Sequence, residues 1–390
     1  APLLAAEDAD LVDDHYIVVL KKDLSSEQLE AHHNLLAAFL AQHGGLSDEG
    51  GQNELRHVYE MEGMRGYAGK FSSEVVDRVR EAPEVDFVER DSVVYATALQ
   101  KNAPWGLARI SHREALTFRT FNKYPYDARA GSDVTAYIVD TGVNIHHQDF
   151  EGRAEWGATI PEGDEDVDGN GHGTHVAGTV AGKRYGVAKK AKIVAVKVLR
   201  SNGSGSMSDV VRGVQWVAEA HEAAKLKSKN NKRSASVANM SLGGGYSRAL
   251  NMAVDAVVDT GVHFAVAAGN DNRDACDYSP ASAKNAVTVG ASTIEDERAW
   301  FSNYGKCTDV FAPGKDITST WIGSNVATNT ISGTSMASPH VCGLMAYLLS
   351  LKDNPRDVTP DELKEELIRT SVKGVLEGIP KDTKNRLVFS

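Results

Sequence analysis

Short apolar segments alternate with helical segments through the central part of this 390-residue chain. The apolar segments are rich in Val, Ala and Ile and cover residues 134–139, 193–199, 236–240, 263–269 and 286–290. Helical patterns lie between them at residues 208–224 and 248–259. Runs that are apolar throughout are typical of strands buried on both sides. The alternation therefore predicts an α/β fold, a mostly parallel sheet with helices on both faces.

Two of the predicted strands are followed directly by a polar side chain. Asp140 comes after the run at 134–139, and Asn270 comes after the run at 263–269. The carboxyl ends of parallel strands meet at the edge of the sheet where α/β enzymes carry their chemistry. Taken alone each residue has a plainer interpretation, since Asp140 with Thr141 and Gly142 could form a turn, as could Asn270 with Asp271.

Two further segments supply a base and a nucleophile. His172 lies between glycines at the start of a helical pattern, where neighbouring backbone can approach the imidazole closely. Ser335 opens a helix that is apolar nearly all round. A hydroxyl is a poor nucleophile unless a base, an orienting carboxylate and donors for the oxyanion surround it. We therefore interpret Ser335 as nucleophile, His172 as general base and Asp140 as its carboxylate partner.

The segments around Asp140, His172 and Ser335, in that chain order, resemble the three motifs of the subtilisin-like serine proteases. Residues 103–110, 201–205 and 301–305 look like the proteinase K branch, in which the fungal vacuolar proteases are most similar. The resemblance implies a subtilisin-like fold and a serine endopeptidase of broad specificity. It also implies that the Asn270 side chain and the Ser335 backbone N–H stabilise the oxyanion.

The same resemblance implies a substrate groove built from segments with few side chains. Such edges accept an extended peptide as an added strand, although plain turns are the alternative for glycine-rich loops. No acidic residue lies in either wall of the implied specificity pocket, so we expect cleavage after apolar or aromatic residues. The expected groove residues are Gly203, Ser204, Gly205, Ser241, Leu242, Gly243, Ala267, Ala268 and Gly269.

The first part of the chain has a different pattern. Strand and helix signals follow one another in the order β-α-β-β-α-β over residues 15–89, which predicts a small α+β, ferredoxin-like domain. This order resembles the inhibitory propeptide of subtilisin-like proteases, with an unrelated binding domain as the alternative. We expect residues 1–98 to be a propeptide and residues 99–390 to be the peptidase domain. The bond that is cleaved would then join Ala98 and Leu99, and Tyr95 would be the fourth residue before that bond.

Net charge and hydropathy limit the classes of molecule that the chain is expected to bind. Lys and Arg number 42 against 53 Asp and Glu, a net charge of −11, which argues against a nucleic-acid partner. No apolar run reaches the roughly 18 residues of a membrane span. Protein and peptide substrates and the chain's own propeptide are the expected partners. The chain starts at Ala1 without a basic, apolar leader, so we expect a secretory signal to have been removed or omitted, and the resemblance implies a vacuolar or extracellular location.

Three cysteines allow one disulfide and one free thiol. The resemblance pairs Cys276 with Cys307, and an oxidising compartment would permit this bond. Cys342 lies on the apolar helix that follows Ser335, where we expect a packed thiol.

No cofactor is expected for catalysis, and metal sites are weakly indicated. Asp164, Asp166 and Asp168 copy the start of an EF-hand loop, but the twelfth position holds His175 instead of the required Glu. His172 and His175 lack a third zinc ligand nearby in sequence. The resemblance to proteinase K implies a structural calcium ion held by Asp309 and by the backbone carbonyls of Lys284 and Ala286.

Two other functions remain open from sequence. One keeps the same three catalytic residues but acts on esters or on a single dedicated protein. The other is a catalytically silent binding module locked by its propeptide.

Overall fold

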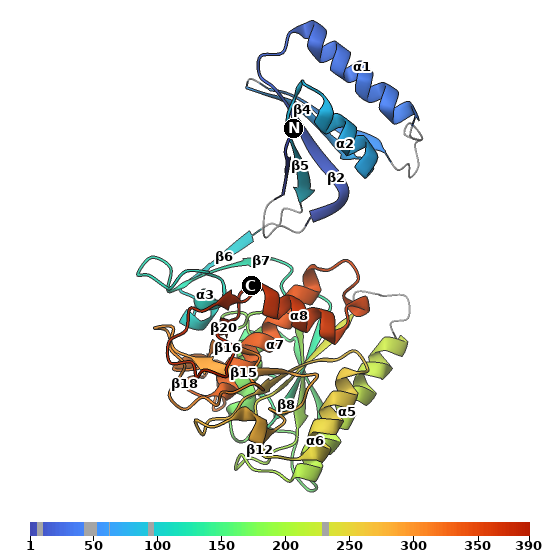
Figure 1. The fold of residues 1–390 in the computed structure, drawn as a ribbon. Coiled ribbons are helices and arrows are strands. Elements are labelled where there is room, and N and C mark those ends of the chain that lie inside the picture. Colours follow the sequence, from blue (N-terminus) through green and yellow to red (C-terminus); the bar gives the residue numbers. More distant parts are fainter. Residues whose placement is uncertain (6–10, 43–52, 62, 93–96, 228–233) are drawn as a thin grey trace. The chain divides into compact units, whose positions relative to one another are not determined.

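The computed structural model describes residues 1–5, 11–42, 53–61, 63–92, 97–227 and 234–390. It divides into two compact units, Ala1–Tyr95 and Ala96–Ser390, which are described one at a time. Figure 1 shows the order of helices and strands within each unit.

The first unit is a five-stranded sheet in the order β1-β5-β2-β4-β3, with two helices packed on it. Its elements are β1 (Leu3–Leu4), β2 (Leu11–Leu20), α1 (Ser26–Gln42), β3 (Glu54–Met61), β4 (Met64–Lys70), α2 (Ser73–Glu81) and β5 (Val85–Ser92). The predicted β-α-β-β-α-β order is confirmed, and β2 to β5 pair antiparallel. The two-residue β1, which pairs parallel with β5, was not predicted. The predicted helix stop at residues 44–45 lies outside the described residues.

The second unit is built on a nine-stranded sheet in the order β19-β20-β16-β15-β13-β11-β8-β10-β9. Every pair of neighbours is parallel except β19 and β20, which confirms the prediction of a mostly parallel sheet. The strands of this sheet are β8 (Val134–Asp140), β9 (Ala154–Thr159), β10 (Lys192–Lys197), β11 (Ala235–Met240), β13 (His263–Ala267), β15 (Val287–Ser292), β16 (Val310–Pro313), β19 (Val372–Lys373) and β20 (Arg386–Leu387).

Three strand pairs and six longer helices complete the unit. The pairs are β6 (Thr97–Lys101) with β7 (Lys123–Asp127), β12 (Gly244–Gly245) with β14 (Tyr278–Ser279), and β17 (Ile317–Thr320) with β18 (Thr328–Ile331). The helices are α3 (Trp105–Ile110), α4 (His172–Ala181), α5 (Met207–Lys227), α6 (Arg248–Val258), α7 (Thr334–Leu351) and α8 (Pro360–Thr370). Short 3₁₀ turns lie at Gln148–Phe150, Ala275–Asp277 and Pro355–Asp357.

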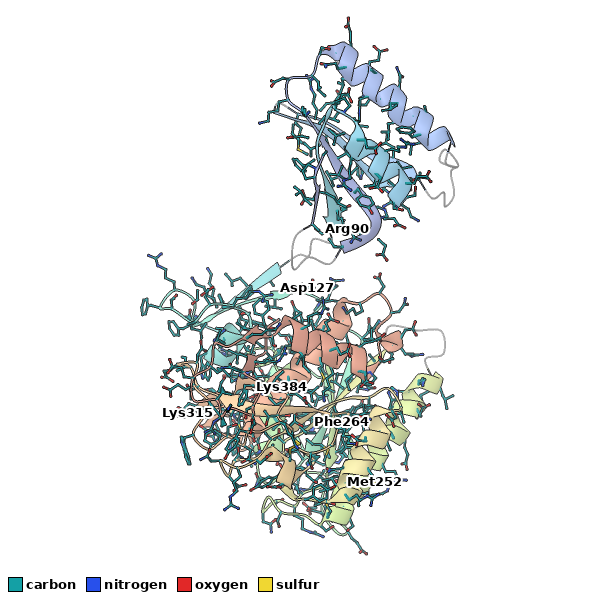
Figure 2. All side chains as sticks on the ribbon, viewed as in Figure 1. Arg90, Asp127, Met252, Phe264, Lys315 and Lys384 are labelled. Carbon is teal, nitrogen blue, oxygen red and sulfur yellow. A yellow bond between two sulfur atoms is a disulfide. The ribbon has the colours of Figure 1, made fainter. Side chains whose placement is uncertain are left out.

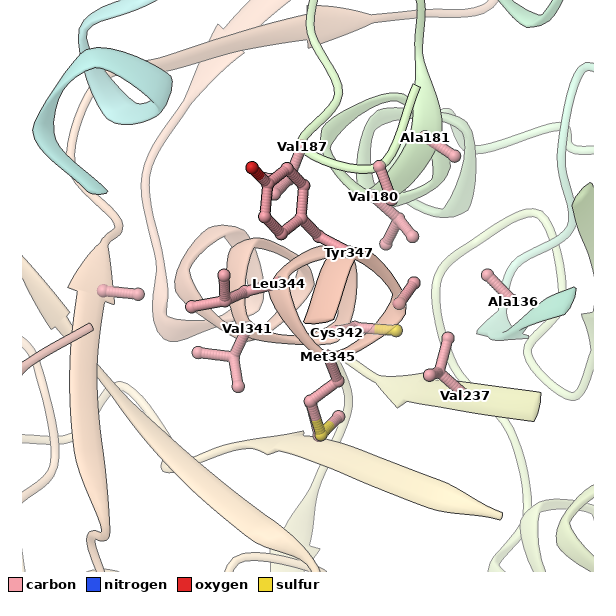
Figure 3. Close-up of a cluster of buried hydrophobic side chains, with 14 of the residues drawn as sticks. Ala136, Val180, Ala181, Val187, Val237, Val341, Cys342, Leu344, Met345 and Tyr347 are labelled. Atoms are coloured by element: carbon pink, nitrogen blue, oxygen red, sulfur yellow. The ribbon is translucent and has the colours of Figure 1, made fainter. Parts of the chain in front are cut away.

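Helices cover both faces of the large sheet because successive side chains of a strand point to opposite sides. In β8, Ala136 and Ile138 join the core under α4 and α7, and Tyr137 and Val139 join the core under α5 and α6. Figure 3 shows the first of these cores around α7, with Val180 of α4 and Val237 of β11 on two sides of the helix and Leu344 on another. The predicted two-sided cover of helices is confirmed.

Other side chains of the unit also lie inside the core or on the surface according to the face of the element that carries them. Phe264 of β13 is buried, whereas Met252 of α6 is exposed to solvent (Figure 2). Helix α8 starts with a capping box, in which the Thr359 hydroxyl accepts from the Glu362 N–H and the Glu362 carboxylate accepts from the Thr359 N–H. Among the helices in the described ranges, none is both long enough and apolar enough to cross a membrane.

One predicted boundary was wrong. The helical pattern was predicted to end at residue 224, but α5 continues to Lys227, so Lys225, Leu226 and Lys227 are helical. Their side chains are exposed, and Lys225 pairs with Glu222 one turn earlier in the helix. Residues 228–233 lie outside the described residues.

Candidate active site

Asp140 and His172 are in direct contact. Asp140 is the last residue of β8 and is fully buried, and His172 is the first residue of α4. The His172 Nδ1 and the Asp140 Oδ1 are 2.7 Å apart, and the Thr141 N–H donates to the same oxygen at 2.7 Å. Burial opposes protonation of His172, but attraction to Asp140 outweighs it and raises the pKa of the imidazole above 6.5.

The glycines beside His172 are needed for this contact. At Gly173 a Cβ atom would lie 2.1 Å from the Gly142 carbonyl oxygen and 3.2 Å from the Asp140 Cβ. At Gly171 the backbone φ is +99°, a left-handed conformation that favours glycine. Helix α4 therefore begins close against the end of β8 because neither neighbour of His172 carries a side chain.

A second buried carboxylate, Asp168, holds the loop that leads into α4. One of its oxygens accepts from the Thr141 hydroxyl at 2.9 Å and from the Asn170 and Gly171 N–H groups at 3.0 and 2.9 Å. The other accepts from the Thr174 N–H at 3.0 Å and from the Thr174 hydroxyl. From sequence Asp168 was considered only as a calcium ligand, because its position within a loop gave no sign of this role.

Ser335 is the second residue of α7. Its hydroxyl donates to the Ser241 carbonyl oxygen at 3.2 Å, and the Ser241 hydroxyl donates to the Ser335 carbonyl oxygen at 2.7 Å. The hydrogen bonds in the described part of the chain do not include one between Ser335 and His172. The predicted nucleophile and base therefore adjoin the same segment, residues 241–244, without being hydrogen-bonded in this conformation.

Asn270 follows β13 and is fixed by its amide oxygen. That oxygen accepts from the Thr334 N–H at 2.8 Å and from the Thr334 hydroxyl at 2.9 Å. The Thr334 hydroxyl also accepts from the Gly269 N–H at 3.1 Å. With its oxygen held in this way, the side chain keeps its amide N–H groups for another acceptor.

Two adjoining cavities contain the candidate residues. The first, of about 510 Å³, is lined by His172 and by residues 203–205 and 241–244. The second, of about 310 Å³, is lined by Asn270, Ser335 and residues 242–245 and 267–269. They have Leu242, Gly243 and Gly244 in common, and together they include all nine predicted groove residues. The structure thus brings the separate sequence segments to one region of the surface.

The lining of the second cavity includes two ionisable residues that were not predicted from sequence, Asp271 and Tyr278. A hydrogen bond to the Asp271 carboxylate and its charge help to raise the pKa of the Tyr278 hydroxyl, with partial desolvation as the largest cause. Asp271 was considered only as part of a turn, although its position directly after Asn270 was a usable signal.

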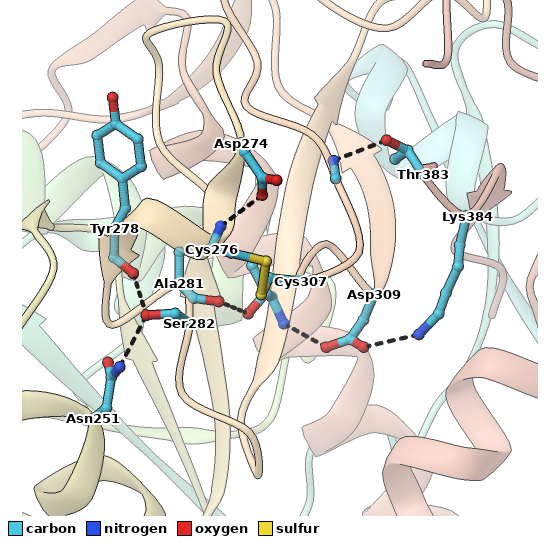
Figure 4. The surroundings of a disulfide bond; sticks show 12 residues. Asn251, Asp274, Cys276, Tyr278, Ala281, Ser282, Cys307, Asp309, Thr383 and Lys384 are labelled. Carbon is cyan, nitrogen blue, oxygen red and sulfur yellow. Dashed lines mark hydrogen bonds and ion pairs between the residues drawn. A yellow bond between two sulfur atoms is a disulfide. The ribbon is translucent and has the colours of Figure 1, made fainter. Parts of the chain in front are cut away.

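The cysteines are as predicted. Cys276 and Cys307 form a disulfide, with their Cα atoms 5.3 Å apart (Figure 4). Cys342 is a free, fully buried thiol on α7, and burial raises its pKa well above the ordinary range. Cys342 therefore behaves as a core side chain.

The residues considered for metals have other partners. The His175 Nε2–H donates to the Ile317 carbonyl oxygen at 2.9 Å, and burial lowers the pKa of the ring to about 4. Asp164 lies 3.5 Å from the Lys197 ammonium, and Asp166 accepts from the Thr159 hydroxyl at 2.6 Å. Within the described ranges, no three His, Cys, Asp or Glu side chains are grouped as metal ligands.

The oxygens expected to hold calcium do not fit a calcium ion in this structure. The ammonium group of Lys364 lies 3.0 Å from the Asp309 carboxylate and donates to the carbonyl oxygens of Lys284 and Ala286. A second lysine, Lys384, lies 3.5 Å from the other Asp309 oxygen (Figure 4). The expected calcium ligands are thus already bonded to a cation of the protein's own.

The parallel sheet with a serine at a helix start and an Asp–His pair at a strand end defines a hydrolase of the serine peptidase class. Comparison with known proteins agrees with this class. Residues 131–386 match the family described as "Subtilase family", and residues 15–97 match "Peptidase inhibitor I9". The chain belongs to the subtilase family and carries an inhibitor I9 domain before its peptidase domain.

Similar proteins cover the whole chain. "Subtilisin-like serine protease Pen c 2" of Penicillium citrinum is 54% identical over 100% of this chain and 90% of its own length. "Subtilisin-like protease 8" of Trichophyton verrucosum is 54% identical over 100% of this chain and 84% of its own length. A crystal structure of a cold adapted subtilisin-like serine proteinase is 45% identical, with a TM-score of 0.66 over 74% of this chain and 99% of that one. These similarities indicate that the chain is a serine peptidase.

Proposed function

We propose that the chain is the self-inhibited zymogen of a broad-specificity serine endopeptidase, with Ser335 as nucleophile, His172 as general base and Asp140 as the carboxylate that orients the imidazole. The observation that carries this proposal is the 2.7 Å contact between His172 Nδ1 and buried Asp140. It leaves Nε2 as the ring nitrogen available to take a proton. The Ser335 hydroxyl must leave the Ser241 carbonyl and turn toward His172, a local rearrangement common in substrate-free sites.

The chemical steps follow from these positions. The Ser335 Oγ attacks the peptide carbonyl carbon while its proton moves to His172 Nε2. The carbonyl oxygen becomes an oxyanion that accepts hydrogen bonds from the Asn270 side-chain amide and the Ser335 backbone N–H, at the positive end of α7. His172 then gives its proton to the leaving amine as the C–N bond breaks. Water releases the acyl group by the same steps in reverse order. This chemistry needs no cofactor.

We place the side chain before the cleaved bond in the second cavity. Ala267, Ala268 and Gly269 supply little polarity there, which favours apolar or aromatic residues. Asp271 is exposed and engaged with Tyr278, so we assign it no cation-binding role. The test compares kcat/KM for peptides that differ only in having Phe, Leu or Lys at that position. A preference for Lys would contradict the proposed specificity.

Processing is proposed to separate residues 1–98 from residues 99–390 at the Ala98–Leu99 bond. Both residues belong to β6, where Ala98 pairs with Tyr126 and Leu99 pairs with Pro125 of β7. A bond paired in this way is not presented to Ser335, so cleavage requires the segment to leave β7 first. N-terminal sequencing of incubated protein tests the site, and a new terminus well outside residues 96–102 would exclude it.

One experiment separates the proposed function from its alternatives. The full chain is incubated, and three properties are followed: labelling of Ser335 by a phosphonylating reagent, the new N-terminus, and digestion of unrelated denatured proteins such as casein. Labelling that rises on loss of the propeptide, together with digestion of several proteins, supports the endopeptidase. Absence of labelling in both states would favour the silent module, and labelling without general proteolysis would favour the ester or dedicated-target enzyme.

We propose that the chain enters the secretory pathway and works in a vacuole or outside the cell, on protein and peptide substrates. The disulfide between Cys276 and Cys307 supports this location, since disulfides persist in oxidising compartments.

A further inference from the structure

The ammonium group of Lys364, in the second unit, is bonded mainly to backbone carbonyls, which is unusual for a lysine side chain. It projects from α8 and donates to the Ala286 carbonyl oxygen at 2.7 Å and to the Lys284 carbonyl oxygen at 3.1 Å. It also lies 3.0 Å from the Asp309 Oδ2. An ammonium group has three N–H bonds, and here each has an oxygen within hydrogen-bonding distance.

The oxygens that meet Lys364 come from two segments that enter the sheet side by side. Lys284 and Ala286 precede β15, and Asp309 precedes β16, its neighbour in the sheet. Asp309 also accepts from the Thr288 N–H of β15 at 3.1 Å. Two carbonyls and a carboxylate that converge in this way are hard oxygen ligands of the kind that binds a divalent cation such as calcium.

The lysine and a metal ion exclude one another at these oxygens. The Lys364 and Asp309 side chains are only 17% and 11% exposed, so a cation there is shielded from most of the solvent. Lys384, 48% exposed, already adds a second positive charge near the same carboxylate. A divalent ion placed among these oxygens would lie close to two ammonium groups that are bound to the same carboxylate. Repulsion between like charges in a partly buried site is costly, so the ion and Lys364 cannot both occupy it.

We propose that Lys364 is a built-in replacement for a structural metal ion: its ammonium group joins α8 to the starts of β15 and β16, and removal of that group creates a calcium site. The joint also supports the specificity cavity. The Thr288 hydroxyl, next to the bond from Thr288 to Asp309, donates to the Ala281 carbonyl oxygen at 2.8 Å, and Ala281 lines that cavity. This proposal does not depend on the proposed catalytic roles.

The experiment uses the full chain carrying Ser335→Ala, which prevents self-digestion during measurement. Thermal unfolding is followed by tryptophan fluorescence, because all five tryptophans lie in residues 96–390. The parent is compared with Lys364→Ala, and with Lys384→Ala as the matched control that removes the same charge from the same carboxylate without touching a carbonyl. Each protein is measured in excess chelator and in calcium at about 5 mM, a concentration suited to a weak site with one carboxylate.

We expect Lys364→Ala to melt roughly 3–6 °C below the parent in chelator and to regain most of this loss in calcium. The parent and Lys384→Ala should show the same calcium shift as each other, smaller than that of Lys364→Ala. Adding Asp309→Asn to Lys364→Ala should abolish the regained stability. Equal calcium shifts in the parent and in Lys364→Ala would overturn the proposal.

A second measurement keeps the proposal open to refutation if Lys364→Ala does not fold. Calcium bound to the parent and to Asp309→Asn is compared by equilibrium dialysis. Equal binding is expected, because Lys364 already occupies the oxygens. Loss of one bound calcium ion in Asp309→Asn would show that calcium displaces the lysine, and the proposal would be wrong.

Discussion

The pKa of His172 connects the geometry of one residue to the pH at which the enzyme can act. As a base the imidazole must be neutral, and the charge of Asp140 raises its pKa above 6.5 in spite of burial. Activity should therefore fall as the pH drops through that raised value, so the acid limb of the kcat/KM profile should have its midpoint above pH 6.5. A midpoint below pH 6.5, measured with a peptide substrate, would contradict the role of the Asp140 charge.

The variant Asp140→Asn tests the contact between His172 and Asp140 by changing the carboxylate. The amide keeps the volume but removes the charge that offsets burial, so the midpoint should move to lower pH. Turnover should fall about 10⁴-fold, as is typical of triad serine proteases that lose this carboxylate. Active-site titration before each assay separates this loss from misfolding. A variant with near-normal turnover would exclude Asp140 as the partner of His172.

Asp168 is a positioning residue by the same residue-level argument. Its two oxygens accept from five donors at Thr141, in the loop before α4 and in the first turn of α4, and its charge also helps to raise the pKa of His172. In Asp168→Asn an NH₂ group must face donors, so the start of α4 should shift. We expect kcat to fall roughly 10- to 100-fold with little change in KM, and the acid midpoint to move down.

The matched control for this change is Asp166→Asn. Asp166 is exposed and accepts from the Thr159 hydroxyl at the end of β9. Its variant should keep both kcat and the pH midpoint. Equal effects of the two substitutions, or a change in KM alone at Asp168, would show that Asp168 does not position His172.

At the scale of elements, the start of α4 depends on how closely it approaches β8. The variant Gly173→Ala adds a Cβ atom 2.1 Å from the Gly142 carbonyl oxygen, which is backbone and cannot swing away. Helix α4 must then move outward from Asp140. We expect a loss of about 1–3 kcal/mol in the free energy of unfolding and a fall of about 100-fold in kcat. Unchanged kcat with unchanged stability would mean that the approach of α4 to β8 is not required.

The elements that sequence predicted well are those whose residues carry their own signal. Strands such as β8 and β13 are apolar on both faces, and the cap of α8 is formed by Thr359 and Glu362. Each of these elements could therefore be located from a few neighbouring residues. Asp140, His172, Ser335 and Asn270 could be proposed from sequence because polar residues at strand ends and a helix start are conspicuous beside apolar runs. What remained hidden depends on distant partners.

Lys364 is the clearest example of a hidden partner. Its ammonium group meets two backbone carbonyls, which any residue supplies, and they lie 80 and 78 positions earlier in the chain. On its own helix it looks like an ordinary surface lysine. The five donors of Asp168 were hidden for a related reason, since three of them are backbone N–H groups whose direction only the folded loop decides.

At the scale of the whole molecule, three buried neutral histidines make stability depend on pH. Burial lowers the pKa of His175 to about 4, of His263 to about 3 and of His340 to about 4. In the unfolded chain each would have a pKa near 6.5. Below pH 6.5 the unfolded state therefore binds protons that the folded state does not bind. The contribution of these histidines to the free energy of unfolding is fully present above pH 6.5 and is lost as the pH falls toward 4.

The free energy of unfolding of the second unit should decrease steeply in this window. Each histidine contributes up to about 1.4 kcal/mol per pH unit well below its unfolded pKa, or about 4 kcal/mol per unit for the three. His172, with its raised pKa, acts in the opposite direction and reduces the slope between pH 6.5 and its own pKa. Most carboxylates titrate below the window from pH 6.5 to 5, and His221, whose pKa burial also lowers, adds to the slope within it.

Denaturant unfolding of the Ser335→Ala full chain, followed by tryptophan fluorescence from pH 7.5 to pH 5, measures this dependence. The variant His263→Phe keeps an apolar ring in the core without a titrating group, so its pH slope should be about one quarter to one third smaller than that of the parent. A free energy that stays flat or rises as the pH falls below 6.5 would mean that the buried histidines accept protons in the folded state, and that their surroundings open more easily than this packing implies.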